Sequence, residues 1–376
     1  MNILICASEY YPYGSGIANV AYNVVEHLKK MGIECKVCSP NGPDITLGSF
    51  KLIKKCGIIG LIYYWYQVSV FFKNHNSDFD VAWCHNPFFF KNNPFNRCLI
   101  TMNSTYYGEA TEGAYPLHLK IYKKIVSKLE KYSLNNLDSG VRFTGVGNNV
   151  CKELEKIGIQ KERINYIQNG VCTEKFKPSC NKNDLRTKFG LPEDEVLILS
   201  IGRLSKIKQT LKLVEVFSLI EKLTTGINLI IAGNGELFDE TKRFIERNKL
   251  KRVFLLGHVG HQRDAPDLYA CSDYFIISSK YEGGEPPLTL SEAMSSGLPC
   301  IVSDIPNFRI VENANCGIVV DFNNVELAAE RIIGYIKRDN SQHSINARTY
   351  ATKYLGWEKI AENYLKEFHK LEHFRG

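Results

Sequence analysis

Residues Ser278 to Asp304 read SSKYEGGEPPLTLSEAMSSGLPCIVSD, and they join a short apolar run, Tyr274 to Ile277, to a helical pattern that begins near Leu288. A glycine-rich turn that enters a helix presents free backbone N–H groups and the positive end of the helix dipole, which suits a phosphate. One turn inside that helix, Glu292 can accept two hydrogen bonds from a diol such as a ribose. The stretch therefore predicts a nucleotide site, and the simpler alternative is a surface turn with a solvated glutamate.

Outward from this stretch, short apolar segments alternate with helical patterns along the chain. Such alternation is typical of parallel sheets with helices on both faces, and 376 residues leave room for about two to three domains. Residues 179–194 are polar and are broken by Gly190 and Pro192, as expected of a linker. The clearest predicted strands are residues 3–6, 35–38, 81–84, 196–201, 228–232, 253–256 and 317–320. The sequence thus predicts an α/β protein with doubly wound sheets.

The net charge of +7 lies entirely in the N-terminal half, because residues 1–180 hold 21 lysines and arginines against 14 acidic residues. Such asymmetry predicts an anionic partner for that half, either a membrane surface or a charged acceptor. Nucleic acid is not expected as a partner.

Two segments are candidates for contact with a membrane. Gly57 to Phe72, GIIGLIYYWYQVSVFF, is too short to span a bilayer. It is either a buried helix or a helix in the membrane interface, anchored by Trp65 and its tyrosines and flanked by lysines. Leu117 to Leu134 carries lysines along one side of a helix and Ile121, Ile125 and Leu129 along another. A solvated charged face is the alternative for this second segment.

The twelve cysteines are expected to be free thiols in a reducing compartment. The N-terminal run MNILICA lacks a basic region and is too short for a signal peptide. Cys35 and Cys38 form one C-x-x-C, but a zinc site needs four ligands at matched spacing. We therefore expect a cytoplasmic protein, peripheral at the membrane.

Residues 282–299, EGGEPPLTLSEAMSSGLP, resemble the donor-binding signature of the family 4 retaining glycosyltransferases, which have the GT-B fold. That family has two glutamates eight positions apart, the first at the donor sugar and the second at the ribose. Glu292 matches the second. Glu285 matches the first if one residue is deleted and Glu282 if two are inserted, and we prefer Glu285 because it keeps the order of the loop. The resemblance also implies that Leu288 and Thr289 bind the donor.

Other motifs of the second half agree with this resemblance. Gly202 to Lys208, GRLSKIK, resembles the family's G-R-L-x-x-x-K-G, with Gln209 in place of the last glycine. The resemblance implies that Arg203 and Lys208 neutralise the two phosphates of the leaving nucleotide. It also implies that Gly202 and Gly233 let the backbone approach the donor, and that the loop holding Val259 meets the base.

The first half matches the family less closely. Gly14 to Ile17 resembles the glycine loop after the first strand, which places Gly16 near the donor phosphates. Asn103 stands where the family has a histidine near the donor sugar. Asn can hydrogen-bond a hydroxyl but cannot titrate near neutral pH. The resemblance implies two Rossmann-like domains that face a central cleft. They are residues 1–178, joined by the C-terminal helix 357–376, and residues 179–356, the donor domain.

No metal or other cofactor is expected. Asp78 and Asp80 imitate a metal-binding D-x-D, but they lack a nearby third ligand and fit a turn. The resemblance implies a retaining, metal-independent transfer from a UDP- or GDP-sugar to a glycan or a lipid-linked acceptor. The alternatives are a GT-B synthase or phosphorylase, and a non-catalytic nucleotide-sugar-binding scaffold of a glycosylation complex.

Overall fold

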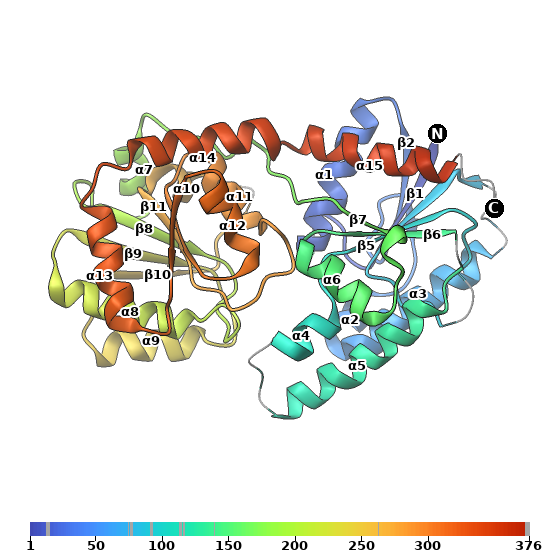
Figure 1. The fold of residues 1–376 in the computed structure, drawn as a ribbon, viewed down its shortest axis with the longest axis horizontal. Coiled ribbons are helices and arrows are strands. Elements are labelled where there is room, and N and C mark those ends of the chain that lie inside the picture. The colour runs from blue at the N-terminus through green and yellow to red at the C-terminus, as the bar shows by residue number, and fades with distance from the viewer. Residues whose placement is uncertain are drawn as a thin grey trace. The chain divides into compact units, whose positions relative to one another are not determined.

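The computed structural model describes residues 1–12, 16–73, 75, 78–90, 93–112, 115, 117–138, 140–261 and 263–372. Contacts divide the chain into two compact units (Figure 1). The first comprises residues 1–170, 283–285 and 357–376, and the second comprises residues 171–282 and 286–356. The first unit's main segment ends at Gly170, eight residues before the boundary after Pro178 that the sequence motifs predicted.

The first unit is built on a parallel sheet of seven strands in the order β3-β2-β1-β4-β5-β6-β7. Leu4 and Cys6 of β1 face a core shared with α3, α5 and α6. On the other face, the ring of Trp83 packs against Tyr364 and Phe368 of α15, at 4.7 and 5.8 Å between centroids. The strands are β1 (Asn2–Ala7), β2 (Glu34–Ser39), β3 (Ile45–Thr46), β4 (Val81–His85), β5 (Cys98–Met102), β6 (Val141–Gly145) and β7 (Ile164–Tyr166). The helices are α1 (Gly16–Lys30), α2 (Phe50–Cys56), α3 (Ile58–Phe72), α4 (Tyr106–Glu112), α5 (Leu117–Asn135), α6 (Asn148–Ile157) and α15 (Trp357–Glu372).

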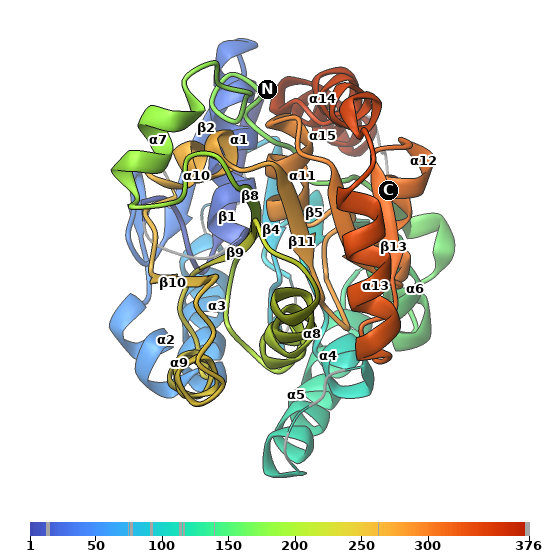
Figure 2. The same cartoon turned by 90° about the vertical axis from the view of Figure 1, so that its left-hand side faces the viewer.

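The second unit has a parallel sheet of six strands in the order β10-β9-β8-β11-β12-β13. Leu197 and Leu199 of β8 enter the core beneath α10, α11 and α14, whereas Ile198 between them enters the core beneath α8 and α13 (Figure 2). The strands are β8 (Val196–Ile201), β9 (Ile227–Ala232), β10 (Val253–Gly257), β11 (Tyr274–Ile277), β12 (Cys300–Ser303) and β13 (Gly317–Val320). The helices are α7 (Lys182–Lys188), α8 (Thr210–Leu223), α9 (Phe238–Arg247), α10 (Ala265–Cys271), α11 (Leu288–Ser295), α12 (Arg309–Asn313), α13 (Val325–Ile336) and α14 (Ser341–Tyr354). Both sheets are therefore covered on both faces, as the alternating pattern predicted.

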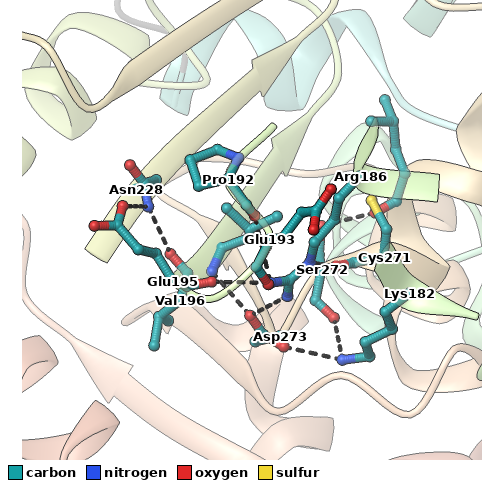
Figure 3. Close-up of polar contacts among 12 residues, drawn as sticks. Lys182, Arg186, Pro192, Glu193, Glu195, Val196, Asn228, Cys271, Ser272 and Asp273 are labelled. Carbon is teal, nitrogen blue, oxygen red and sulfur yellow. Dashed lines mark hydrogen bonds and ion pairs between the residues drawn. The ribbon is translucent and has the colours of Figure 1, made fainter. Parts of the chain in front are cut away.

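The segment predicted as a linker contains helix α7, which is fixed to the second unit by a buried arginine (Figure 3). Arg186 is 4% exposed. Its guanidinium pairs with Asp273 at 2.7 Å and donates to the carbonyl oxygens of Cys271 and Glu195, both at 3.0 Å. Lys182 also pairs with Asp273, at 2.9 Å. The polar composition did not indicate this helix, because its most buried side chain is an arginine with several acceptors, beside the partly buried Leu185 and Phe189.

Gly57 to Phe72 was predicted to be either a buried helix or a helix in the membrane interface. Helix α3 is buried on one face only. Trp65 is fully buried with Tyr64 and Phe72, so the expectation that Trp65 anchors an interfacial helix is wrong. Within the described part of the chain, no helix is both long and apolar enough to cross a membrane.

Candidate donor site

The candidate site of the second unit lies where its strand order reverses. The chain runs outward from β8 to β9 and β10, and then returns to place β11 on the other side of β8. In open α/β sheets, ligands bind outside the carboxyl ends of the strands at such a switch point. The predicted donor residues follow those ends: the loop of Arg203 and Lys208 leaves β8, and the loop of Glu282 leaves β11. The topology therefore gathers them at one edge of the sheet.

The glycines of this edge are required by close backbone packing. Gly202 and Gly233 have φ angles of +148° and +139°, in the region that favours glycine. A Cβ atom on Gly233 would collide with the carbonyl oxygen of Gly202, and one on Gly235 with that of Leu204. Leu204 donates its N–H to the Asn234 carbonyl at 3.0 Å. The loops after β8 and β9 thus pack backbone against backbone.

Lys208 is held in place by Glu282. The two side chains form an ion pair, and Ser279 donates its hydroxyl to the same carboxylate at 2.6 Å. Ser278 donates to the carbonyl of Lys208 at 2.9 Å, which joins the loops after β8 and β11. Arg203 is exposed, and no carboxylate of the described chain forms an ion pair with it. One cation is therefore fixed by a buried carboxylate, and the other is available to a ligand.

Helix α11 begins at Leu288, as predicted, after Pro287, whose side chain gives no capping hydrogen bond. Among the described residues, no acceptor is hydrogen-bonded to the N–H groups of Leu288 and Thr289 in its first turn. Both residues are half-buried. This is the arrangement that suits an anion at a helix N-terminus.

Glu292 is 4% exposed, and its carboxylate is held by two side chains. His261 Nε2 lies 2.6 Å from Oε1, and the Tyr269 hydroxyl donates to Oε2 at 3.0 Å. Burial raises the pKa of Tyr269 well above its usual value, so this hydroxyl keeps its proton. Each carboxylate oxygen has a second lone pair, so a diol can still be accepted. Sequence reasoning missed Tyr269 and His261, which carry no signal in the motif and meet Glu292 only in the fold.

Val259 lies in the loop after β10 and is half-buried against the core. In the first unit, Gly16 begins α1 and is exposed. Gly14 and Ser15 of the predicted glycine loop lie outside the described residues.

Asn103 follows β5 and contacts the end of β4. Its amide nitrogen donates to Asn86 Oδ1 at 3.1 Å and lies 3.3 Å from His85 Nδ1. His85 is fully buried, and burial lowers its pKa to about 3, so the ring is neutral and accepts from Asn103. The amide nitrogen of Asn103 is therefore held by two neighbours, and among the described residues no donor lies within hydrogen-bond distance of its side-chain oxygen.

The two candidates for the first motif glutamate fall in different units. Glu285 groups with the first unit, where its carboxylate accepts a hydrogen bond from the backbone N–H of Asn148 at 2.8 Å. Glu282 belongs to the second unit with Lys208. The preference for Glu285 stays a prediction.

Across the described ranges, no group of three or more His, Cys, Asp or Glu side chains is arranged to hold a metal ion. Asp80 of the D-x-D sequence accepts the backbone N–H of Asn2 at 2.7 Å, and Asn2 donates its side chain to the Asp78 carbonyl at 2.9 Å. These contacts tie the segment of the two aspartates to the first residue of β1.

Two doubly wound parallel sheets, the second with glycine-rich loops and the cations Arg203 and Lys208 at its carboxyl edge, are the architecture that the GT-B resemblance implied. The profile of Glycosyl transferases group 1 matches residues 181–352, and that of Glycosyltransferase Family 4 matches residues 14–175. The chain belongs to the family 4 glycosyltransferases, which confirms the resemblance seen in its motifs.

Relatives and solved structures agree with this assignment. The chain is 35% identical over 179 residues to the UDP-Gal:alpha-D-GlcNAc-diphosphoundecaprenol alpha-1,3-galactosyltransferase of Escherichia coli, which covers 46% of this chain and 45% of that protein. The chain spans about half the length of the curated relatives it matches. The fold is similar to WaaG, a glycosyltransferase involved in lipopolysaccharide biosynthesis, with a TM-score of 0.74 and 17% identity over 96% of this chain and 99% of WaaG. It is also similar to HepE of Anabaena in complex with UDP-glucose, with a TM-score of 0.72 and 17% identity over 98% and 100% of the two chains.

Proposed function

We propose that this glycosyltransferase moves a sugar from a UDP-sugar to a lipid-linked acceptor, with retention of the anomeric configuration and without a metal. The observation that carries the proposal is the cluster at the switch point of the second unit, where Arg203, Lys208 and the first turn of α11 meet at one edge with Glu292. Two cations and free N–H groups suit a diphosphate, and the carboxylate suits the ribose.

In the proposed reaction, the bond between the sugar C1 and the diphosphate oxygen breaks while the acceptor hydroxyl forms a bond to C1 from the same face. The hydroxyl proton passes to the departing phosphate oxygen, which gives a glycoside and UDP. Arg203 and Lys208 stabilise the negative charge that grows on the leaving group. Glu282 keeps the Lys208 ammonium in position.

The remaining site residues have supporting roles in this proposal. The oriented amide of Asn103 hydrogen-bonds a hydroxyl of the donor sugar, and Glu285 contacts the same sugar. The backbone around Gly16, Gly202 and Gly233 approaches the phosphates, and the Val259 loop meets the base. Binding and charge stabilisation of this kind need no nucleophilic side chain.

The choice of donor and acceptor is supported by the comparisons and by charge. HepE was solved with UDP-glucose, and the Escherichia coli relative is named for a UDP-sugar donor and a diphosphoundecaprenol-linked acceptor. A lipid diphosphate also fits the basic N-terminal half of this chain. We therefore propose UDP in preference to GDP, and a polyprenyl-diphosphate-linked sugar as the acceptor.

The proposal is tested by measuring transfer from UDP-glucose and UDP-galactose to GlcNAc-diphosphoundecaprenol, with and without EDTA. Arg203→Ala and Lys208→Ala should each lower kcat by roughly 10²–10³-fold, the scale for losing one electrostatic contact to the transition state. Lys242→Ala, at an exposed position of α9, is the control. Wild-type rates in both site variants would refute the donor site, and an inverted product or loss of activity in EDTA would refute the mechanism. UDP binding without transfer to this acceptor would favour the scaffold.

A further inference from the structure

Helix α5 of the first unit has two apolar faces, and its own core accounts for only one. Val126 and Leu134 point inward and are buried. At 3.6 residues per turn, a second apolar row runs along the opposite side of the helix. Its members and their exposed fractions are Leu117 at 75%, Ile121 at 51%, Ile125 at 56% and Tyr132 at 58%. A run of large apolar side chains in water marks a surface that is covered by something else.

A row of lysines lies beside this apolar row. It consists of Lys120, Lys124, Lys128 and Lys131, all exposed. Among the residues that the structure describes, no carboxylate lies within ion-pair distance of these four. Lys123, on the inward-turning side, behaves differently, because it pairs with Glu109 and lies over the ring of Tyr106. The lysine row and the apolar row together are called the α5 face.

The neighbouring elements extend the same pattern. The junction of α2 and α3 lies beside α5, since a Cβ on Gly57 would be 3.7 Å from the Tyr122 hydroxyl. Helix α2 has no buried residue and exposes Lys51, Lys54 and Lys55. Helix α3 has its own outward apolar row, with the spacing four, three and four: Ile59, Tyr63, Tyr66 and Val70, which are 68%, 43%, 63% and 55% exposed. In both views the N-terminal end of α5 projects from its unit (Figures 1 and 2).

We infer that the α5 face docks on the surface of an anionic lipid bilayer, with the helix axis parallel to the membrane plane. In that position the apolar row enters the boundary between head groups and acyl chains, and the lysines meet lipid phosphates. Charge complementarity favours this occupant, because α5 and the neighbouring α2 expose seven lysines, none of which forms an ion pair with a carboxylate of the described residues. A nucleic acid would leave the apolar row in water, and a second copy of the chain would place lysines against lysines.

The inference is tested by sedimentation with vesicles, in the absence of donor and acceptor. The chain should bind vesicles of equal parts phosphatidylglycerol and phosphatidylcholine, and binding should weaken with salt and with pure phosphatidylcholine. The triple variant Lys120→Gln, Lys124→Gln and Lys128→Gln should lower the partition coefficient by roughly 10²-fold, since each lysine near an anionic surface contributes about a factor of five. The double variant Ile121→Gln with Ile125→Gln should lower it by roughly tenfold or more.

A matched control removes the same charge elsewhere: Lys222→Gln, Lys242→Gln and Lys251→Gln, all exposed in the second unit, should leave vesicle binding unchanged. Three outcomes overturn the inference. They are failure of the wild type to bind the anionic vesicles, equal loss of binding in the two triple variants, and a concentration-dependent dimer that the isoleucine variant dissociates. Because no transfer is measured, failure here is distinct from failure of the proposed transferase reaction.

Discussion

Replacing Glu292 with alanine should weaken UDP binding by about 1–3 kcal/mol, the scale for losing hydrogen bonds to a charged acceptor. At about 1.4 kcal/mol per decade, Kd rises by roughly 5- to 150-fold. The structure sets this expectation, because the carboxylate is 4% exposed and is already oriented by His261 at 2.6 Å and Tyr269 at 3.0 Å. A ribose therefore meets a fixed acceptor and pays little for ordering it.

Calorimetry with two ligands isolates this contact. UDP and UDP that lacks both ribose hydroxyls are titrated into wild type and Glu292→Ala. In wild type, removing the diol from UDP should lower the binding free energy by about as much as Glu292→Ala does. In the variant, removing the diol should leave the affinity almost unchanged, since the acceptor has gone. Tyr269→Phe, which removes one of the two groups that orient the carboxylate, should give a smaller loss confined to the ligand with the diol.

The control for these titrations is Glu330→Ala, at an exposed position on α13 of the same unit. Thermal unfolding of each variant reports whether the fold is kept. An unchanged affinity of Glu292→Ala for UDP refutes the ribose contact. Equal losses for UDP and for the ligand without the diol refute it as well, because the mutation would then act through the surrounding structure.

Two further predictions concern stability. Burial raises the pKa of Glu130 to about 8, above its unfolded value of 4.5, so its stabilising contribution is complete below about pH 4.5 and is lost as pH rises through 8. Relative to Glu130→Gln, wild type should lose up to about 4 kcal/mol of unfolding free energy between pH 5 and 8 in urea titrations, and parallel profiles would contradict this. Gln209 has a φ angle of +52°, which favours glycine, the residue of the family motif at this position. Gln209→Gly should therefore raise the unfolding free energy by about 0.5–1 kcal/mol. A variant with a lower unfolding free energy than wild type would contradict backbone strain at this residue.

Much of the fold could be predicted from local patterns. The predicted strand 196–201 and the helix start at Leu288 agree with β8 and α11 as they stand in the structure. Apolar alternation and helical spacing are local signals, because each is set by the geometry of one element. Helix α7 was missed for the same reason, since its buried Arg186 depends on acceptors from α10 and from Glu195, just before β8, that the local sequence does not reveal.

The sequence predicted which residue types the candidate site holds and how they are spaced along the chain, but it did not predict the contacts between their side chains. Arg203, Lys208 and Glu292 were found because glycine loops and charges follow predicted strands. The partners that fix them were not found. Tyr269 and His261 meet Glu292 across a turn and a helix, and Glu282 reaches Lys208 from the loop after β11.

Residue order alone is enough for the period of each helix and strand, the glycines at strand ends and the uneven charge of the two halves, because these depend on neighbours a few positions apart. The tertiary structure decides which carboxylate holds which cation, which face of α3 and α5 is left in water, and why Trp65 is buried. Those outcomes depend on residues tens of positions apart in the chain, which are brought together only when the sheets are wound and their faces covered.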